Sequence, residues 1–142
     1  MAQRWPSVRY RGEERQAALR RLVRQADGNV LCVGTLADVF AEADRAVVCL
    51  ERDGSPIEEL LVLRTHNRLY ALVNRCPHLE RQLDDARVHG NVLTCRGHDK
   101  SYNLRSGRMT GRLSRGGPVV LRSVRAWDED GQLFLDITAL RA

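Results

Sequence analysis

Short apolar runs separated by turn-forming residues make up most of the chain from residue 29 onward. The first four runs are NVLCVG at 29–34, RAVVCLE at 45–51, EELLVLRT at 58–65 and RLYALVNR at 68–75. Turn residues stand between them at 53–56 and at 66–67, and Thr35 is placed to cap a short turn before Val39. Short strands with turns at this spacing are typical of an antiparallel β-barrel or β-sandwich, so we expect an all-β fold.

The strand pattern is interrupted between about residues 75 and 118 and then resumes. Inside the interruption, NVLTC at 91–95 is expected to form one short strand after a turn at His89-Gly90. After it, VVLRSVRAW at 119–127 and QLFLDI at 132–137 flank a turn and are expected to complete the sheet. The interruption is therefore predicted to be a subdomain inserted into a single β domain.

The first 28 residues follow a different pattern. A narrow apolar stripe at helical spacing runs through residues 13–25 and consists of Ala17, Ala18, Leu19, Leu22 and Val23. Two glutamates suit the first turn of such a helix, and Asp27-Gly28 would end it. We predict an N-terminal extension at 1–28 with a short amphipathic helix, followed by one domain at 29–142. The helix would pack on that domain or serve in docking or dimerisation.

Two short cysteine–histidine pairs lie within the predicted insertion. Cys76 and His78 are separated by one residue, and Cys95 and His98 by two, with sixteen residues between the pairs. Such pairs let a tight loop present a thiolate and an imidazole to one metal site. Four ligands of this kind can hold a tetrahedral zinc ion, or a [2Fe–2S] cluster in which two histidines replace two cysteines on one iron.

The surroundings of these pairs resemble the Rieske family. Leu83, Ala86, Val88 and Gly90 match the family's usual residue types, as do Tyr102-Asn103-Leu104, Ser106-Gly107 and the loop Gly116-Gly117-Pro118. The resemblance spans roughly residues 29 to 137. It implies a Rieske-like antiparallel β-sandwich or barrel whose inserted subdomain, at about 75–118, binds one [2Fe–2S] cluster.

The resemblance also assigns roles to residues. It implies that Cys76 and Cys95 bind one iron and that His78 and His98 bind the other, with Tyr102 and Pro118 next to the cluster. Arg81 and Gly97 stand where high-potential members carry a disulfide, and Lys100 where they carry a serine donor. Within the range of about −150 to +300 mV for such centres, we therefore expect a low to intermediate potential, raised somewhat by Tyr102.

As a function, the resemblance implies a stand-alone ferredoxin that carries one electron at a time. Its partners would be a flavin-dependent reductase and a terminal oxygenase or similar acceptor, and it would itself be no enzyme and take no small-molecule substrate. An oxygenase subunit would need a further domain, for which 142 residues leave no room. The alternatives are a small redox subunit or redox-sensing regulatory module of a larger complex, and a zinc-stabilised Cys2His2 binding module.

Charge and composition narrow the range of partners and locations. The net charge is +5, and residues 75–115 alone carry nine basic and four acidic side chains. A basic surface there would attract an acidic partner protein. Nucleic acid is not expected, because the arginines are scattered without interleaved aromatic residues. No apolar run approaches the roughly 20 residues of a membrane span, and no secretory signal is apparent, so we expect a cytoplasmic protein.

The remaining cysteines and histidines are given structural roles. Cys32 and Cys49 lie in apolar, strand-like runs and are predicted to be buried, reduced core residues. His66 and His89 flank turn residues and are predicted to lie on the surface.

Overall fold

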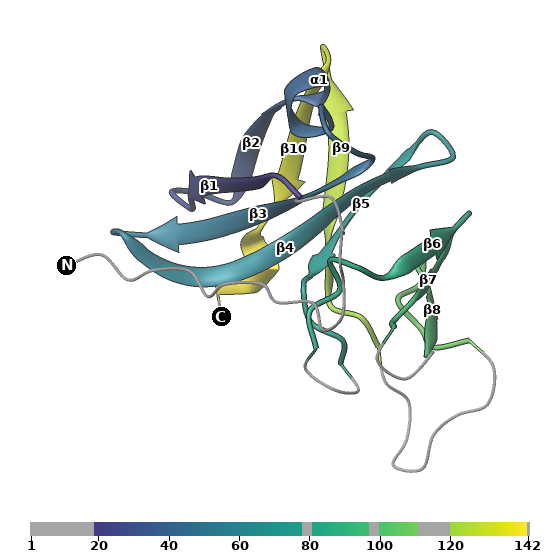
Figure 1. Ribbon diagram of the computed structural model, residues 1–142. Coiled ribbons are helices and arrows are strands. Elements are labelled where there is room, and N and C mark those ends of the chain that lie inside the picture. The colour runs from purple at the N-terminus through teal and green to yellow at the C-terminus, as the bar shows by residue number, and fades with distance from the viewer. Residues whose placement is uncertain (1–18, 78–80, 97–99, 111–119, 142) are drawn as a thin grey trace.

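The structure is a computed structural model that describes residues 19–77, 81–96, 100–110 and 120–141. Its elements in chain order are β1 (Arg21–Gln25), β2 (Val30–Thr35), α1 (Leu36–Val39), β3 (Arg45–Arg52), β4 (Ser55–Thr65), β5 (Arg68–Val73), β6 (Arg87–His89), β7 (Val92–Thr94), β8 (Ser101–Asn103), β9 (Ser123–Glu129), β10 (Gln132–Asp136) and the 3-10 helix η1 (Thr138–Arg141). The all-β fold predicted from the sequence is confirmed (Figure 1).

Seven of the strands form one strongly curved sheet in the order β1-β3-β4-β5-β9-β10-β2. Every neighbouring pair is antiparallel except β1 and β3, which run parallel. The two edge strands are joined by a side chain, since Arg24 Nε on β1 donates to the Val33 carbonyl oxygen on β2 at 2.8 Å. The sheet is thereby nearly closed into a barrel.

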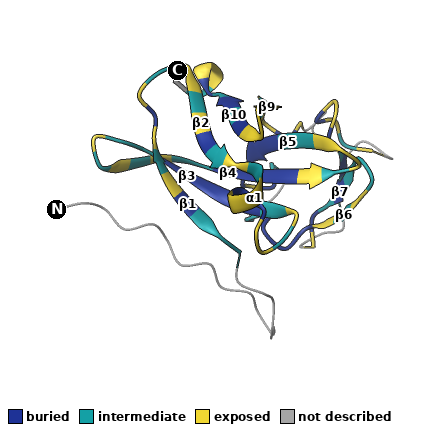
Figure 2. Cartoon of the chain, turned by 90° about the horizontal axis from the view of Figure 1, so that it is seen from above, coloured by how far each residue is buried: buried dark blue, intermediate teal, exposed yellow. Residues whose placement is uncertain are grey.

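The central strands are buried on both faces, which explains why their sequences are continuous apolar runs. On β3, Ala46, Val48 and Leu50 point into the barrel and belong to its inner core. Residues of three other strands join them there: Leu60 and Val62 of β4, Ala71 and Val73 of β5, and Leu133 and Leu135 of β10. The alternate residues Val47 and Cys49 belong to a second, outer core on the opposite face. Buried residues accordingly follow one another along β3, β4 and β5 (Figure 2).

The outer core lies between this sheet and a smaller sheet of strands β6, β7 and β8. The predicted insertion thus forms a subdomain packed on the barrel. Gly107 fixes one point of close approach: its φ is +76°, and a Cβ there would lie 2.9 Å from the Leu121 carbonyl oxygen. Glycine tolerates this backbone conformation and provides the space, so Leu121 N can donate to Gly107 O at 2.8 Å.

Most of the predicted elements are present. The runs expected as strands correspond to β2, β3, β4, β5, β7, β9 and β10. Thr35 caps α1 as expected, because its hydroxyl accepts from Asp38 N at 3.1 Å. The turn residues Asp53, His66 and Asn67 adopt the left-handed conformation that favours such positions.

The helix predicted over residues 13–25 is wrong for its second half. Residues 21–25 form strand β1, which pairs with residues 47–51 of β3. Leu22 and Ala26 are buried in the inner core, whereas Val23, part of the supposed stripe, is exposed. The apolar spacing fitted a helix, but a parallel partner distant in sequence stabilises the strand. The first half of the predicted helix lies outside the described residues, and the domain boundary placed at residue 28 stays a prediction.

Cys32 also departs from its predicted environment. It is exposed and its thiol donates to Gln132 Oε1 at 3.2 Å, whereas Cys49 is buried as expected. Strand β2 is an edge strand with one face toward solvent, and on it Val33 takes the inward position. In the described part of the chain, no helix is long and apolar enough to cross a membrane.

Candidate metal centre

The two cysteines predicted as ligands each begin a loop, and both loops have the same backbone hydrogen bond. Cys76 follows β5, and its backbone N–H donates to the carbonyl oxygen of Arg81, five residues on, at 2.6 Å. Cys95 follows β7, and its N–H donates to the carbonyl oxygen of Lys100, also five residues on, at 2.8 Å. Each cysteine thus begins a segment that a backbone hydrogen bond closes at the same spacing.

Both cysteines are withdrawn from solvent. Cys76 is 0% and Cys95 1% exposed, and both belong to the outer core. No disulfide joins any of the four cysteines. Burial raises the pKa of Cys49, which lies in the same core, to about 11. Cys49 is therefore a neutral thiol at physiological pH and a poor candidate for a metal ligand.

Tyr102, on β8, reaches the first of these cysteines. It is fully buried, and its hydroxyl lies 3.5 Å from Cys76 Sγ. Burial, followed by the contact with Cys76, raises the pKa of the Tyr102 phenol, so the hydroxyl keeps its proton. A protonated phenol beside a metal-bound thiolate can only be the donor of the hydrogen bond, because the thiolate has no proton.

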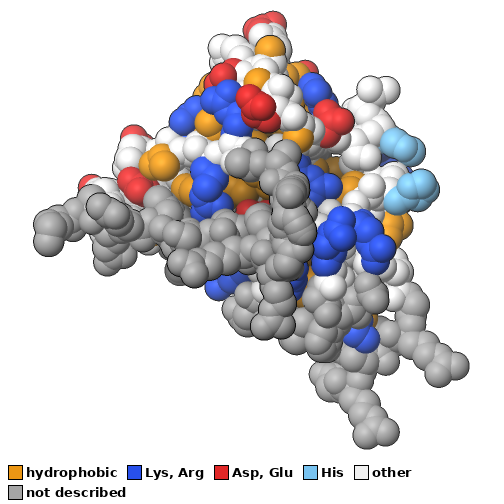
Figure 3. Space-filling model, viewed as in Figure 1, with side chains coloured by type: hydrophobic (Ala, Val, Ile, Leu, Met, Phe, Trp, Pro, Cys, Tyr) orange, Lys and Arg blue, Asp and Glu red, His pale blue; other side chains and the backbone are white. Residues whose placement is uncertain are grey.

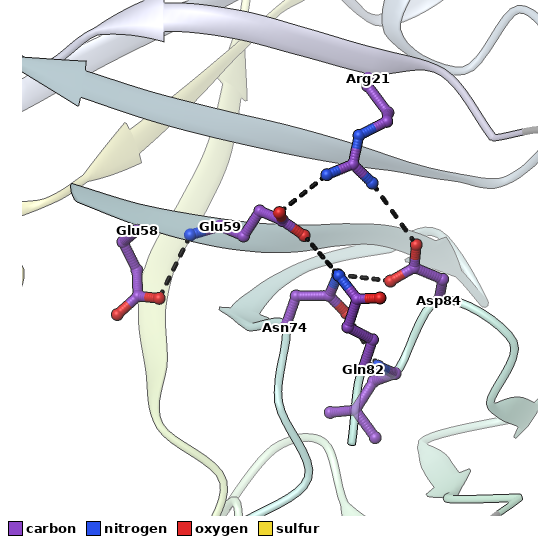
Figure 4. A network of polar contacts seen from close by, with 7 residues as sticks. Arg21, Glu58, Glu59, Asn74, Gln82 and Asp84 are labelled. Atoms are coloured by element: carbon purple, nitrogen blue, oxygen red, sulfur yellow. Dashed lines mark hydrogen bonds and ion pairs between the residues drawn. The ribbon is translucent and has the colours of Figure 1, made fainter. Parts of the chain in front are cut away.

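A buried amide holds the chain on the far side of the first loop. Asn74 Oδ1 accepts from Leu83 N at 2.9 Å, and Asn74 Nδ2 donates to Glu59 Oε1 at 3.1 Å and to the Asp84 carboxylate (Figure 4). Gln82 Nε2 adds a bond to Glu59 Oε1 at 3.2 Å. The segment before Cys76 is therefore tied to the segment that follows its loop.

Arginines from two other strands complete this network. Arg21 on β1 lies between the carboxylates of Glu59, at 2.7 Å, and Asp84, at 3.7 Å (Figure 4). The Asp84 side chain is 1% exposed, so its charge depends on this partner. Arg45 Nη1 donates to the backbone oxygens of Asp84 and Ala86, at 2.9 and 2.7 Å. The sequence analysis did not predict roles for Arg21, Arg45 or Asn74. Of these, only Asn74 carries a sequence signal, because it stands two residues before Cys76.

The surface of the subdomain is basic. Arg81 is paired with Asp85 at 2.6 Å, but Arg105 and Arg108 are exposed. Figure 3 shows lysine and arginine side chains over both sheets, whereas the acidic side chains on this face lie over the seven-stranded sheet. His66 and His89 are exposed, as predicted.

The predicted site is thus described in part. Cys76, Cys95 and Tyr102 lie in one core, with Tyr102 in contact with Cys76. His78, His98 and Pro118 lie outside the described residues.

A family model for the Rieske [2Fe-2S] domain matches residues 12–119, which is most of the chain. The chain belongs to the Rieske [2Fe-2S] domain family. Its cofactor is accordingly a [2Fe–2S] cluster, and the alternative of a zinc-stabilised module is set aside. No curated protein sequence matches the chain.

Solved structures with this fold include both ferredoxins and oxygenases. The Rieske chain matches the ferredoxin of carbazole 1,9a-dioxygenase from Nocardioides aromaticivorans IC177 with a TM-score of 0.58 and 22% identity, covering 76% of this chain and 97% of that one. A chain from a complex of reduced oxygenase and oxidized ferredoxin in carbazole 1,9a-dioxygenase matches with a TM-score of 0.57 and 21% identity. This match covers 76% of the present chain and 93% of that one. A chain from the reduced complex between oxygenase and ferredoxin in carbazole 1,9a-dioxygenase matches with a TM-score of 0.61 and 24% identity. That match covers 76% of the present chain but only 28% of the other. At these identities the likeness is one of fold.

The described residues fit the family's cofactor. Two cysteines are buried at matched loop positions, and a protonated phenol is in place to donate to one of them. Thiolate ligands and nearby hydrogen-bond donors are what a cluster of this type requires of its protein.

Proposed function

We propose that this Rieske protein is a one-electron carrier that passes electrons from a flavin-dependent reductase to an oxygenase or similar acceptor. The observation that carries the proposal is the pair of matched loops, which bury Cys76 and Cys95 in one core beside the Tyr102 hydroxyl.

In the proposed ligand set, Cys76 and Cys95 bind one iron and His78 and His98 bind the other. The bound [2Fe–2S] cluster supplies a one-electron redox couple. The chain's own residues tune and protect it. The outer core excludes water from the sulfur ligands, and Tyr102 donates a hydrogen bond to Cys76 Sγ, which favours the more negative, reduced state.

The network of hydrogen bonds around Asn74, Arg21 and Arg45 supports the first cysteine loop. Electron transfer is efficient when the ligands move little between oxidation states. The bonds from Asn74, Arg21 and Arg45 fix both ends of the segment that carries Cys76. We assign these three side chains a positioning role.

The proposed partners rest on two further points. Among the similar solved structures is a ferredoxin of carbazole 1,9a-dioxygenase, which this fold covers over 97% of its length, and this likeness supports a carrier. The exposed arginines of the subdomain supply a basic surface for transient docking of an acidic partner. A carrier serving a cytoplasmic oxygenase would itself be cytoplasmic.

The proposal is tested by anaerobic coulometric titration of the purified protein. A carrier takes up one electron per chain reversibly and returns one electron per chain to an added oxidant such as ferricyanide. Uptake of two electrons, or consumption of an organic substrate together with oxygen, would point instead to a catalytic subunit.

A further inference from the structure

Two neighbouring cavities lie between the barrel and the cluster-binding subdomain, and neither is lined by Cys76, Cys95 or Tyr102. One, of about 300 Å³, is lined largely by apolar side chains, among them Leu69, Leu104, Leu121 and Val124. The other, of about 280 Å³, is lined by polar and basic residues that include His66 and Arg68. Tyr70 and Arg105 line both cavities, so the two adjoin and form one cleft.

The junction of the cleft holds a polar group without a partner. Tyr70 Oη is buried, and no other group in the described part of the chain hydrogen-bonds to it. A buried hydroxyl in this condition costs the fold free energy that a bound acceptor would recover. The Tyr70 side chain lines both cavities, so its hydroxyl is the candidate donor to a ligand bound where they meet.

The charge of the cleft is positive. Neither lining contains an aspartate or glutamate. Within the described ranges, Arg68 and Arg105 take part in no ion pair with an acidic side chain. The turn that bears Arg105 is held in place, because Asn103 Oδ1 accepts from the backbone N–H groups of Arg105 and Ser106 at 2.8 and 3.2 Å. Two available guanidinium groups and an unpaired hydroxyl suit a carboxylate.

We propose that this cleft binds a small organic carboxylate. Its carboxylate lies between Arg68, Arg105 and the Tyr70 hydroxyl, and its apolar body lies against Leu104 and Leu121. Both cavities have the size of a small-molecule site, and apolar walls with a few convergent polar groups are typical of such sites. The ligand is bound without chemical change and is distinct from the electron partners.

The test measures the binding of benzoate to the cluster-loaded protein by isothermal titration calorimetry. Benzamide has the same shape without the charge, and inorganic phosphate has charge without an apolar body. We expect saturable binding of benzoate and at least about tenfold weaker binding of both comparison compounds, since a charge-assisted hydrogen bond contributes roughly that factor. Equal binding of benzamide or of phosphate overturns the proposed ligand class, and unsaturable binding of benzoate overturns the site.

Two variants tie the binding to these side chains. Tyr70→Phe removes the unpaired hydroxyl, so it should raise the melting temperature of the ligand-free protein while weakening benzoate binding about tenfold. Arg68→Gln should weaken it similarly. Arg87→Gln, at an exposed arginine of β6 that lines neither cavity, should leave it unchanged. A Tyr70→Phe protein with a lower melting temperature and unchanged affinity would make the hydroxyl a structural group and contradict the proposal.

Discussion

The Tyr102 hydroxyl lies 3.5 Å from Cys76 Sγ in a core from which water is excluded. A hydrogen bond in such surroundings is not replaced by water when its donor is removed. The bond stabilises the sulfur more strongly as the charge on the site becomes more negative. Its contribution therefore appears in the reduction potential rather than only in the stability of the fold.

Tyr102→Phe should lower the midpoint potential by roughly 40 to 60 mV, which corresponds to about 1 to 1.4 kcal/mol for a one-electron couple. The measurement is a redox titration followed by visible absorption. Tyr70→Phe is the matched control, because it removes the same group from a side chain that lines two cavities to which neither cysteine contributes. An unchanged potential in the Tyr102→Phe protein would refute the proposed hydrogen bond.

At the scale of elements, β1 links the N-terminal part of the chain to the cluster-binding subdomain. Its backbone pairs with β3, and its Arg21 side chain reaches the carboxylates of Glu59 and Asp84. The side chains of Glu59 and Asp84 are 11% and 1% exposed, and both pair with this guanidinium. The strand thus stabilises the segment that follows the first cysteine loop.

Arg21→Ala should destabilise the protein by about 2 to 3 kcal/mol, because it leaves two desolvated carboxylates uncompensated. Arg20→Ala is the matched control, since Arg20 pairs at 3.1 Å with Asp38, whose side chain is 54% exposed. Pairs of that kind contribute about 1 kcal/mol or less. Urea denaturation curves of both variants decide the matter, and equal losses of stability would rule out a special role for Arg21.

The same strand shows where sequence patterns suffice and where they do not. The runs at 45–51 and 58–65 were predicted as strands because both of their faces are buried and leave a continuous apolar signal. The segment RLVRQ has no such signal, and its strand state depends on a parallel partner more than twenty residues away. The pairing of Arg21 with Asp84 is similarly non-local. The cysteine–histidine pairs, by contrast, are local motifs, so the site could be predicted before any element was placed.

At the scale of the whole molecule, the distribution of charge matters more than its sum. The net charge is only +5, but residues 75–115, which carry the cysteine loops, alone hold nine basic and four acidic side chains. Charges spread in this way attract an acidic partner toward the site of electron transfer. The attraction weakens as added salt shortens its range from about 30 Å at 0.01 M to about 8 Å at 0.15 M ionic strength.

Charge reversal of Arg105 and Arg108 to glutamate should therefore slow electron transfer to an acidic acceptor protein about tenfold or more at low salt, with the difference vanishing at high salt. Stopped-flow kinetics over a salt series provide the measurement. Arg64→Glu on β4, which replaces an arginine outside the subdomain paired with Asp44 at 2.9 Å, is the control. If neither the substitutions nor the salt concentration changed the rate of electron transfer, electrostatic docking would be ruled out.

The central claim is that the two loops hold a [2Fe–2S] cluster with two cysteine and two histidine ligands. It is tested most directly by the visible and electron paramagnetic resonance spectra of the purified protein before and after dithionite. We predict a red-brown protein that bleaches on reduction and then gives a rhombic signal with a low average g value. A colourless protein that holds one zinc ion, or a signal typical of all-cysteine ligation, would contradict the assignment of Cys76, His78, Cys95 and His98.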